Sequence, residues 1–256
     1  NYSPLKVPGT VVKDIDGLEA GTNHGRAADK YVYSASVVNQ WLEKPSTQPK
    51  NKKIVFVTFD DGPTTKFTGE QLDNLEKAGA RATFFMIPPQ MRDVGKNMLS
   101  RSLKMGNALA IHSYSHDYKY LYHGSAANKA KHISCDWDWA MAQSRAILGS
   151  NYFSSAFRYP GGHMSWTNLS QADAALAKRG VGWIDWNAMS GDADAQRPTT
   201  VPGYLQMVKK SIKESNNPNV VVILNHDTYG KQMTAKAMPS ILAWLKSQGY
   251  EFGVIA

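Results

Sequence analysis

The alternation of strand-like and helix-like segments after residue 54 is the feature that most constrains the fold. Short runs of Val, Ile and Phe, typical of buried strands, alternate with longer amphipathic segments typical of helices. The expected strands are 54–59, 82–87, 108–112, 156–159, 181–186, 220–225 and 250–255. The expected helices are 68–78, 89–105, 126–148, 169–179, 201–214 and 234–248. Seven strand–helix steps favour an α/β fold with a parallel sheet, and we expect a closed barrel rather than an open sheet.

The first 52 residues differ from the rest of the chain because their hydrophobic periodicity is weak. One short helix is expected at 35–43, and the polar stretch 48–53 is typical of a solvated connector. We therefore divide the chain into an N-terminal extension, residues 1–52, that packs on or leads into the barrel, and one large domain, residues 53–256.

Composition excludes several classes of protein. No apolar run approaches the roughly 20 residues that a membrane-spanning helix needs, so we expect no such helix. The single cysteine, Cys135, excludes an intrachain disulfide and a multi-cysteine metal site. The net charge of +8 suits an anionic partner such as a cell wall. Because the Lys and Arg residues are scattered, we expect no nucleic-acid groove, and no glycine-rich phosphate loop follows any expected strand.

Polar residues capable of chemistry follow five of the expected strands. They are Asp60 and Asp61 after the first strand, His112 and His116 after the third, Arg158 after the fourth, Asp192 in the loop after the fifth, and His226 after the sixth. Parallel barrels place their active sites at the carboxyl ends of the strands. The sequence therefore predicts that these side chains converge on one rim.

Two adjacent carboxylates, Asp60 and Asp61, end the first expected strand. Carboxylates this close raise the pKa of one of the pair unless a cation neutralises them. A metal held by one, with the other kept free as a base, resolves the conflict. His112 and His116 are four residues apart, a spacing that allows both imidazoles to share a zinc-like ion. An isolated pair at this spacing is more often two unrelated surface histidines, but the Asp pair at another strand end favours the metal.

Three further positions have both a functional and a structural interpretation. His226 ends the apolar run 220–224, either as a catalytic group or as a core histidine bonded to a backbone carbonyl. Arg158 either orients a carboxylate or is a surface cation. Gly161 lies in a Pro-Gly-Gly turn, which either brings backbone N–H groups close to a ligand or is an ordinary tight turn. Trp186 lies near the expected rim, where aromatic rings stack on sugars as often as they pack in the core.

Together these stretches resemble the polysaccharide deacetylases of the NodB-homology type, carbohydrate esterase family 4. The matching motifs are TFDDGP at 58–63, HSYSH at 112–116, RYPGG at 158–162 and LNHD at 224–227. Their order and spacing also agree, over about residues 54–256. The resemblance implies a distorted (β/α) barrel with fewer regular strands than eight, consistent with the seven expected strands.

The resemblance also implies the chemical roles at the rim. Asp61, His112 and His116 would bind one divalent metal, commonly zinc, for which cobalt or another divalent ion can substitute. Asp60 would be the general base and His226 the general acid.

Other residues would support these groups. Arg158 would hold Asp60, Leu224 would line the pocket for the acetyl methyl group, and the Gly161 N–H would help to bind the oxyanion. Tyr159 and Trp186 are expected to contact the substrate.

The fourth motif departs from the common form W-x-x-D-x-x-D-W. Met189 stands at its first acidic position and Asp192 at its second. We therefore expect Asp192 to partner His226, with Asp185 as the alternative.

The implied function is a hydrolase that removes N-acetyl groups from N-acetylglucosamine in peptidoglycan and releases acetate. Chitin or chitooligosaccharide is the next substrate, and acetylxylan, an ester, is the third. A catalytically impaired carbohydrate-binding protein is the alternative of another class. Retention of the metal and acid–base residues argues against it, whereas the altered fourth motif leaves it open. We also expect a monomer, located outside the cell or on the surface of a Gram-positive bacterium.

Overall fold

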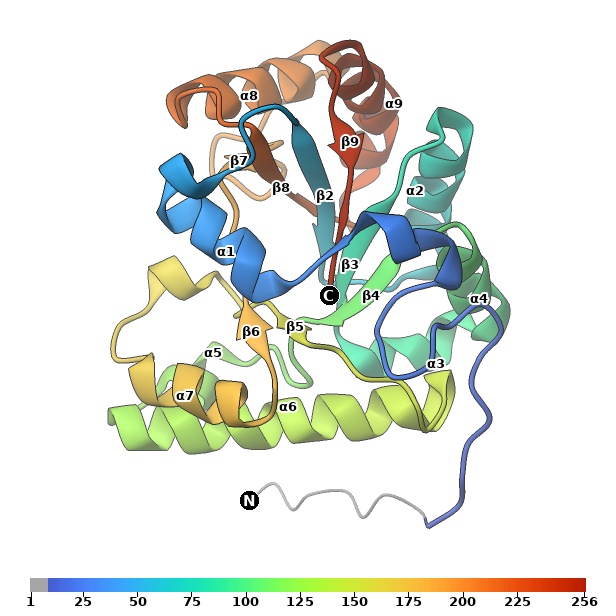
Figure 1. Cartoon of the computed structure of the whole chain (residues 1–256), viewed down its shortest axis with the longest axis vertical. Helices are drawn as coiled ribbons and strands as arrows, with labels where there is room; N and C mark the ends of the chain where they lie inside the picture. Colours follow the sequence, from blue (N-terminus) through green and yellow to red (C-terminus); the bar gives the residue numbers. More distant parts are fainter. Residues whose placement is uncertain (1–8) are drawn as a thin grey trace.

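The computed structural model describes residues 9–256, whose main sheet is surrounded by helices (Figure 1). The strand order is β6-β5-β4-β3-β2-β8-β7, every neighbouring pair is parallel, and β9 also pairs with β2. The strands are β1 Val32–Tyr33, β2 Ile54–Asp60, β3 Ala82–Met86, β4 Ala108–Ile111, β5 Ala156–Phe157, β6 Gly182–Trp183, β7 Ala188–Met189, β8 Val220–His226, β9 Glu251–Phe252 and β10 Val254–Ile255. This parallel arrangement confirms the predicted α/β class.

The helices follow the strands as predicted. They are α1 Ala35–Glu43, α2 Thr65–Ala78, α3 Met91–Val94, α4 Lys96–Lys104, α5 Tyr118–Tyr122, α6 Ala126–Leu148, α7 Ser170–Lys178, α8 Val201–Glu214 and α9 Gln232–Ser247. Short 3₁₀ turns occupy Arg26–Tyr31, Pro45–Thr47, Pro88–Gln90 and His163–Ser165. The bounds of α1, α6 and α8 match the prediction. Each follows a residue, Ser34, Ser125 or Thr200, whose hydroxyl accepts a backbone N–H of the first turn.

The two faces of the sheet bury different sets of apolar side chains. Ile54 and Phe56 of β2 belong to an inner cluster, whereas the alternate residues of β2 pack in the larger cluster with the surrounding helices. Because side chains alternate along a strand, Asp60 lies on the inner face at the carboxyl end of β2. The same alternation places Leu224 and His226 on the inner face of β8, at the same end of the sheet.

The barrel is not closed by hydrogen bonds. β6 and β7 are the two edges of the sheet, and within residues 9–256 no ladder joins them. Residues 184–187 connect them directly, bonding to β5 through Ile184 N–H and to β8 through Asn187 N–H. A link this short spans at most about 17 Å, at about 3.5 Å per residue, so the sheet must curl until its edges lie near each other. The predicted closure is therefore wrong, and the fold is the distorted barrel that the resemblance implied.

Three other details differ from the prediction. The expected strand 250–255 splits at Gly253 into β9, which pairs with β2, and β10, which pairs with β1. The seventh place in the sheet belongs instead to β7, which was not predicted. The expected helix 89–105 is interrupted at Gly95, where φ is 77°.

The described part of the N-terminal extension packs on the barrel. The Ile15 N–H donates to Leu148 O at 2.8 Å, and the Ala35 N–H donates to Ala256 O at 2.7 Å. Val38 of α1 has no exposed surface and joins the inner cluster of the sheet. The domain boundary after residue 52 stays a prediction, and residues 1–8 lie outside the described part. None of the helices in residues 9–256 has both the length and the apolar character that crossing a bilayer requires.

Candidate active site

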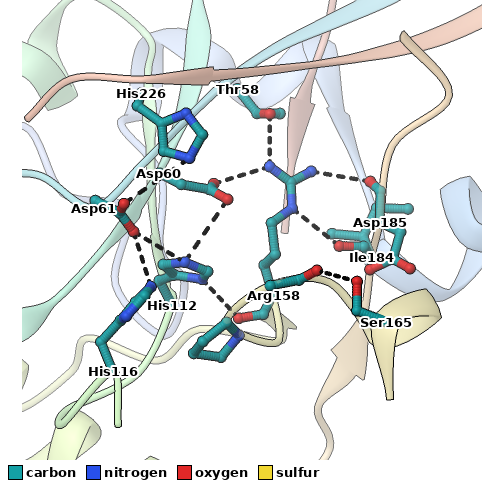
Figure 2. Close-up of polar contacts among 12 residues, drawn as sticks. Thr58, Asp60, Asp61, His112, His116, Arg158, Ser165, Ile184, Asp185 and His226 are labelled. Carbon is teal, nitrogen blue, oxygen red and sulfur yellow. Dashed lines mark hydrogen bonds and ion pairs between the residues drawn. The ribbon is translucent and has the colours of Figure 1, made fainter. Parts of the chain in front are cut away.

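The predicted chemical residues converge at the carboxyl end of the sheet (Figure 2). Asp60 and Asp61 come from the end of β2, His112 and His116 from the loop after β4, and His226 from the end of β8. Because the register pairs Asp60 with His226, these two side chains begin on adjacent strands at the same level of the sheet. The parallel register therefore brings together segments that are far apart in the sequence.

Asp61, His112 and His116 form a compact group of possible metal ligands. Asp61 Oδ1 lies 3.2 Å from His112 Nε2 and 3.1 Å from His116 Nε2. One ligand atom from each residue lies within 4.8 Å of the other two. Asp61 Oδ1 is buried yet accepts no hydrogen bond of normal geometry within the described chain. Two imidazole nitrogens and one buried carboxylate oxygen without a hydrogen-bond donor fit a divalent ion of the zinc type.

The electrostatics of these three residues agree with that arrangement. Burial alone would raise the pKa of Asp61, but the ring nitrogens of His112 and His116 outweigh it and hold this pKa well below its usual range. Burial opposes charge on His116, but the Asp61 carboxylate prevails and raises the pKa of the imidazole. His112 Nδ1 lies 2.8 Å from the Arg158 carbonyl oxygen, which fixes its ring with Nε2 turned toward Asp61.

Two of the candidate ligands have left-handed backbone conformations that are uncommon outside glycine. φ is 74° at Asp61 and 47° at His116. Such conformations cost about 1–2 kcal/mol each and persist where the surrounding structure imposes them, often at functional sites. The local backbone is thus strained at two of the residues that would hold the ion.

Asp60 is held by a buried arginine. Arg158 Nη1 donates to Asp60 Oδ1 at 3.0 Å and to Thr58 Oγ1 at 2.7 Å, and neither charged side chain has more than 4% exposed surface. The remaining guanidinium nitrogens donate to the backbone carbonyls of Ile184 and Asp185. These two carbonyls belong to the link between the sheet edges, so the guanidinium joins that link to β2. The predicted contact between Arg158 and Asp60 is present, and it is charge-assisted.

Asp192, rather than Asp185, is the partner of His226. Asp192 Oδ1 lies 2.8 Å from His226 Nδ1, and its Oδ2 accepts the His226 backbone N–H at 2.9 Å. Burial alone would lower the pKa of His226, but Asp192, with help from Asp60 and Asp61, raises it to about 9. The imidazole is therefore protonated at neutral pH. Its Nε2 lies 3.9 Å from Asp61 Oδ2, so the proton on Nε2 faces the other site residues.

Close packing against Asp227 explains why a glycine, Gly62, stands in the TFDDGP motif. A Cβ on Gly62 would lie 2.5 Å from both carboxylate oxygens of Asp227. Asp227 is buried, and burial raises its pKa to about 7. The Thr68 hydroxyl donates to Asp227 Oδ2, and the Asp227 N–H donates to Asp60 O. A side chain at position 62 would therefore displace the turn that carries both motif carboxylates.

Gly161 offers an unused backbone donor, and Leu224 offers an apolar side chain that is only partly covered. The Gly161 N–H donates no hydrogen bond to any residue of the described chain, and the residue is exposed with φ 79°. Leu224 is only half-buried and belongs to neither large apolar cluster, although it lies between buried residues of β8. A free donor and an uncovered apolar side chain are thus available at the mouth of the barrel.

The two aromatic residues expected to contact the substrate differ in how much of their surface is exposed. Tyr159 has no exposed surface, packs in the larger apolar cluster and donates its hydroxyl to Asp173. The Tyr159 side chain is therefore not open to solvent, and a substrate contact of this residue stays a prediction. Trp186 is half-buried, with its ring 5.4 Å from the Arg158 guanidinium and so close to Gly162 that a Cβ there would lie 2.6 Å from it. Trp186 packs under the Gly-Gly turn, and its contact with substrate stays a prediction.

Two exposed tyrosines are close in the sequence to residues of the site. The Tyr118 ring, 46% exposed, has its centroid 5.5 Å from the His116 ring. Tyr229, 81% exposed, follows His226 by three residues. Residues 115–119, which include the candidate ligand His116, line a shallow depression that is widely open to solvent. Flat rings beside a polar site can stack on sugar rings.

Sequence reasoning missed three polar side chains that support the site. Thr58 could have been found, because it lies two residues before Asp60 and so on the same face of β2. Asp136 also left a signal, because it interrupts the buried stripe of α6. Thr234, which donates to Asp192 Oδ2 at 2.8 Å, left none, since only the fold brings α9 to that loop.

Comparison with known proteins gives consistent results. The family model for polysaccharide deacetylases matches residues 47–178. A bifunctional xylanase/deacetylase of Pseudobutyrivibrio xylanivorans is 30% identical over 82% of this chain and 31% of its own length. A peptidoglycan-N-acetylglucosamine deacetylase of Bacillus cereus is 28% identical over 79% of this chain and 69% of its own length. The chain thus corresponds to less than a third of the first relative and about two thirds of the second.

A solved structure extends the similarity to nearly the whole chain. A family 4 carbohydrate esterase of Streptococcus mutans is 39% identical, with a TM-score of 0.84 over 95% of this chain and 100% of that one. The match includes the curled parallel sheet on which the site is built. This chain belongs to the polysaccharide deacetylase family, carbohydrate esterase family 4.

Proposed function

We propose that this protein is a metal-dependent hydrolase that removes N-acetyl groups from N-acetylglucosamine residues of peptidoglycan and releases acetate. One observation carries the proposal: a carboxylate held by an arginine and an imidazole held by a carboxylate face the same group of metal ligands. The similarity to a peptidoglycan-N-acetylglucosamine deacetylase supports the choice of polymer. The net charge of +8 suits the anionic cell wall.

The residues that would hold the ion are Asp61, His112 and His116, and we propose Zn²⁺, with Co²⁺ as a substitute. Such an ion, when bound, polarises a carbonyl and lowers the pKa of a bound water. The side chains of Asp61 and His116 are each 26% exposed, so the group is open to solvent on one side. That opening gives a substrate access to it.

Asp60 is the proposed general base. The Arg158 guanidinium at 3.0 Å stabilises the carboxylate and fixes its orientation, so that its other oxygen, Oδ2, is directed toward the metal ligands. Oδ2 can take the proton from the attacking water as the new C–O bond forms. We propose that the exposed Gly161 N–H stabilises the developing oxyanion and that Leu224 contacts the acetyl methyl group. Loss of one oxyanion donor typically lowers the rate by about 10²–10³.

His226 is the proposed general acid. An amine leaving from an amide is too basic to depart without a proton. The Asp192 carboxylate keeps His226 protonated at neutral pH, because it raises the pKa of the imidazole to about 9. When the C–N bond breaks, the Nε2 proton passes to the amine, which leaves a free amino sugar and acetate. Asp60 then releases its proton to solvent, and His226 takes one up from solvent, which restores the starting state.

Acetylxylan is the second candidate substrate, and two similarities favour it. One relative is a bifunctional xylanase/deacetylase, and one structural neighbour is an esterase. An ester needs less help from His226, because an alcohol is a better leaving group than an amine. Chitin oligomers and a carbohydrate-binding protein without activity are the remaining alternatives. We also propose a location outside the cell or on the surface of a Gram-positive bacterium.

Acetate release from peptidoglycan, chitin oligomers and acetylxylan tests the function. Chelator should stop the release, Zn²⁺ or Co²⁺ should restore it, and Asp60→Asn should abolish it while metal still binds. The preferred polymer identifies the substrate. If the metal-loaded protein releases no acetate from any of the three polymers, the enzymatic proposal is wrong and the binding protein is the better explanation.

A further inference from the structure

A buried carboxylate outside the strand ends supports the loop that carries both histidine ligands. Asp136 lies on α6 and is 4% exposed. Its neighbours on the same stripe of the helix, Ile133, Trp137 and Ala140, are buried and apolar. Within residues 9–256 no Lys, Arg or His side chain forms an ion pair with Asp136. A buried charge needs compensation, so hydrogen bonds must supply it.

All of those hydrogen bonds come from three consecutive residues of the loop. Asp136 Oδ1 accepts the Ser113 hydroxyl at 2.7 Å and the Tyr114 N–H at 2.8 Å. Its Oδ2 accepts the Ser115 N–H at 2.9 Å. Because the loop is the source of every one of these bonds, the carboxylate and the loop conformation depend on each other.

The contacts continue to the second histidine. The Ser113 hydroxyl, while donating to Asp136, accepts the His116 N–H at 2.9 Å. His116 has the left-handed φ of 47°, a conformation that the loop must impose. A continuous path of hydrogen bonds therefore leads from α6 to the backbone of one candidate ligand, while residues 113–115 connect it to His112.

We propose that Asp136 is a positioning residue that sets the affinity of the site for its divalent ion. It touches neither Asp61 nor the imidazoles, and acts by holding loop 112–116 in the conformation that brings both Nε2 atoms to Asp61 Oδ1. Outer groups that orient metal ligands typically change metal affinity by about 10–100-fold when they are lost. This inference rests on the metal site of the proposed function.

Calorimetric titration of chelator-stripped protein with Zn²⁺ tests it. Asp136→Asn keeps the size of the side chain, but its NH₂ group cannot accept a backbone N–H, so at least one of the three bonds is lost. We expect the Kd for Zn²⁺ to rise by about 10–100-fold. Asp138→Asn is the matched control, because Asp138 lies two residues along the same helix and pairs with Arg179 at a partly exposed position. Its Kd should stay within about twofold of wild type.

Two further readouts separate positioning from a general loss of structure. At saturating metal, Asp136→Asn should recover most of the wild-type kcat with an unchanged KM, because the substrate contacts are intact. The absorption spectrum of bound Co²⁺, which reports ligand geometry, should change in Asp136→Asn and stay unchanged in Asp138→Asn. Thermal unfolding of the stripped proteins checks that the variants are folded.

The outcomes distinguish this inference from the proposed function. If wild type binds Zn²⁺ and both Asp136→Asn and Asp136→Ala bind it equally well, the role of Asp136 is refuted and the metal site stands. If wild type binds no divalent ion, both proposals fail. If neither Asp136 variant folds, Ser113→Ala decides, since it removes only the hydroxyl that joins Asp136 to the His116 N–H. A raised Kd in Ser113→Ala supports the inference, and a wild-type Kd overturns it.

Discussion

Replacing Asp192 by Asn should move the alkaline limb of the pH–activity profile. The carboxylate faces His226 twice, through Nδ1 at 2.8 Å and the backbone N–H at 2.9 Å, and Asp192 is 2% exposed. The other charged groups that act on the imidazole are Asp60 and Asp61. The rise of the pKa from 6.5 to about 9 corresponds to about 3 kcal/mol in favour of the imidazolium. Replacing the Asp192 carboxylate by an amide removes the largest contribution that raises this pKa, whereas burial of His226 still lowers it.

The size of the effect follows from the fraction of protonated acid. If the pKa of His226 falls from about 9 to about 6.5, the protonated fraction at pH 8 falls about 30-fold, whereas at pH 6 it changes by less than about twofold. We therefore expect kcat of Asp192→Asn to decline strongly at pH 8 and mildly at pH 6. Bound metal would lower the pKa in both proteins, so the difference between their profiles is the tested quantity.

The assay is acetate release at saturating substrate from pH 5 to pH 10. Asp194→Asn, an exposed acid in the same loop, is the control and should keep the wild-type profile. If the alkaline limb of Asp192→Asn coincides with that of wild type, Asp192 does not set the proton affinity of His226 and the argument is refuted.

The interaction between Asp192 and His226 also makes the stability of the protein depend on pH. Because the folded-state pKa of His226 is raised, its stabilisation is fully present below about pH 6.5 and is lost as the pH rises through about 9. For metal-free protein, the difference in unfolding free energy between wild type and Asp192→Asn should be larger at pH 6 than at pH 10. Urea unfolding at both pH values measures it, and a larger difference at pH 10 would contradict the assigned direction.

Three further substitutions test other parts of the site. Arg158→Lys should lower the unfolding free energy by about 3 kcal/mol and reduce kcat, because an ammonium cannot satisfy the four acceptors that the guanidinium satisfies. Urea unfolding measures the stability, and a variant as stable as wild type would contradict this prediction. Gly162→Ala should cost at least about 2 kcal/mol and lower kcat, because its Cβ meets Trp186 at 2.6 Å. Gly79→Ala is the control: φ is 61° there and a Cβ meets open space, so it should cost only about 1 kcal/mol. If calorimetry shows the same loss of stability in both variants, the clash with Trp186 is refuted. Tyr118→Ala should raise KM for oligomers about fivefold and leave KM for a single acetylated sugar unchanged, because the exposed ring would stack on a neighbouring sugar. An equal change of KM for both substrates would argue against this stacking.

The helices were predictable where their ends carry local signals. Ser34, Ser125 and Thr200 cap the helices whose bounds agree with the prediction, because a hydroxyl and its backbone partner are neighbours in the sequence. β7 was not predictable, since Ala188 and Met189 form a strand only by pairing with β8.

The convergence of the candidate metal and acid–base residues was predictable because each lies at the end of a buried strand or in the loop after it, and parallel strands end on the same side. The supporting residues were harder to find. Asp136 left a weak signal as a charge on an apolar stripe, while Thr234 left none. The motif position of Tyr159 indicates proximity to the site but not the direction of its side chain, which packs in the larger apolar cluster.

The sequence by itself determined the strand–helix order, the set of groups that could do chemistry and their common location at the carboxyl ends of the strands. These follow from residue type and short-range periodicity. The tertiary structure alone decided that Asp192 and not Asp185 faces His226, that the barrel stays open between β6 and β7, and that Asp136 lies beneath the histidine loop. Each of these depends on contacts between distant segments, whose geometry is set by packing of the whole sheet and its helices.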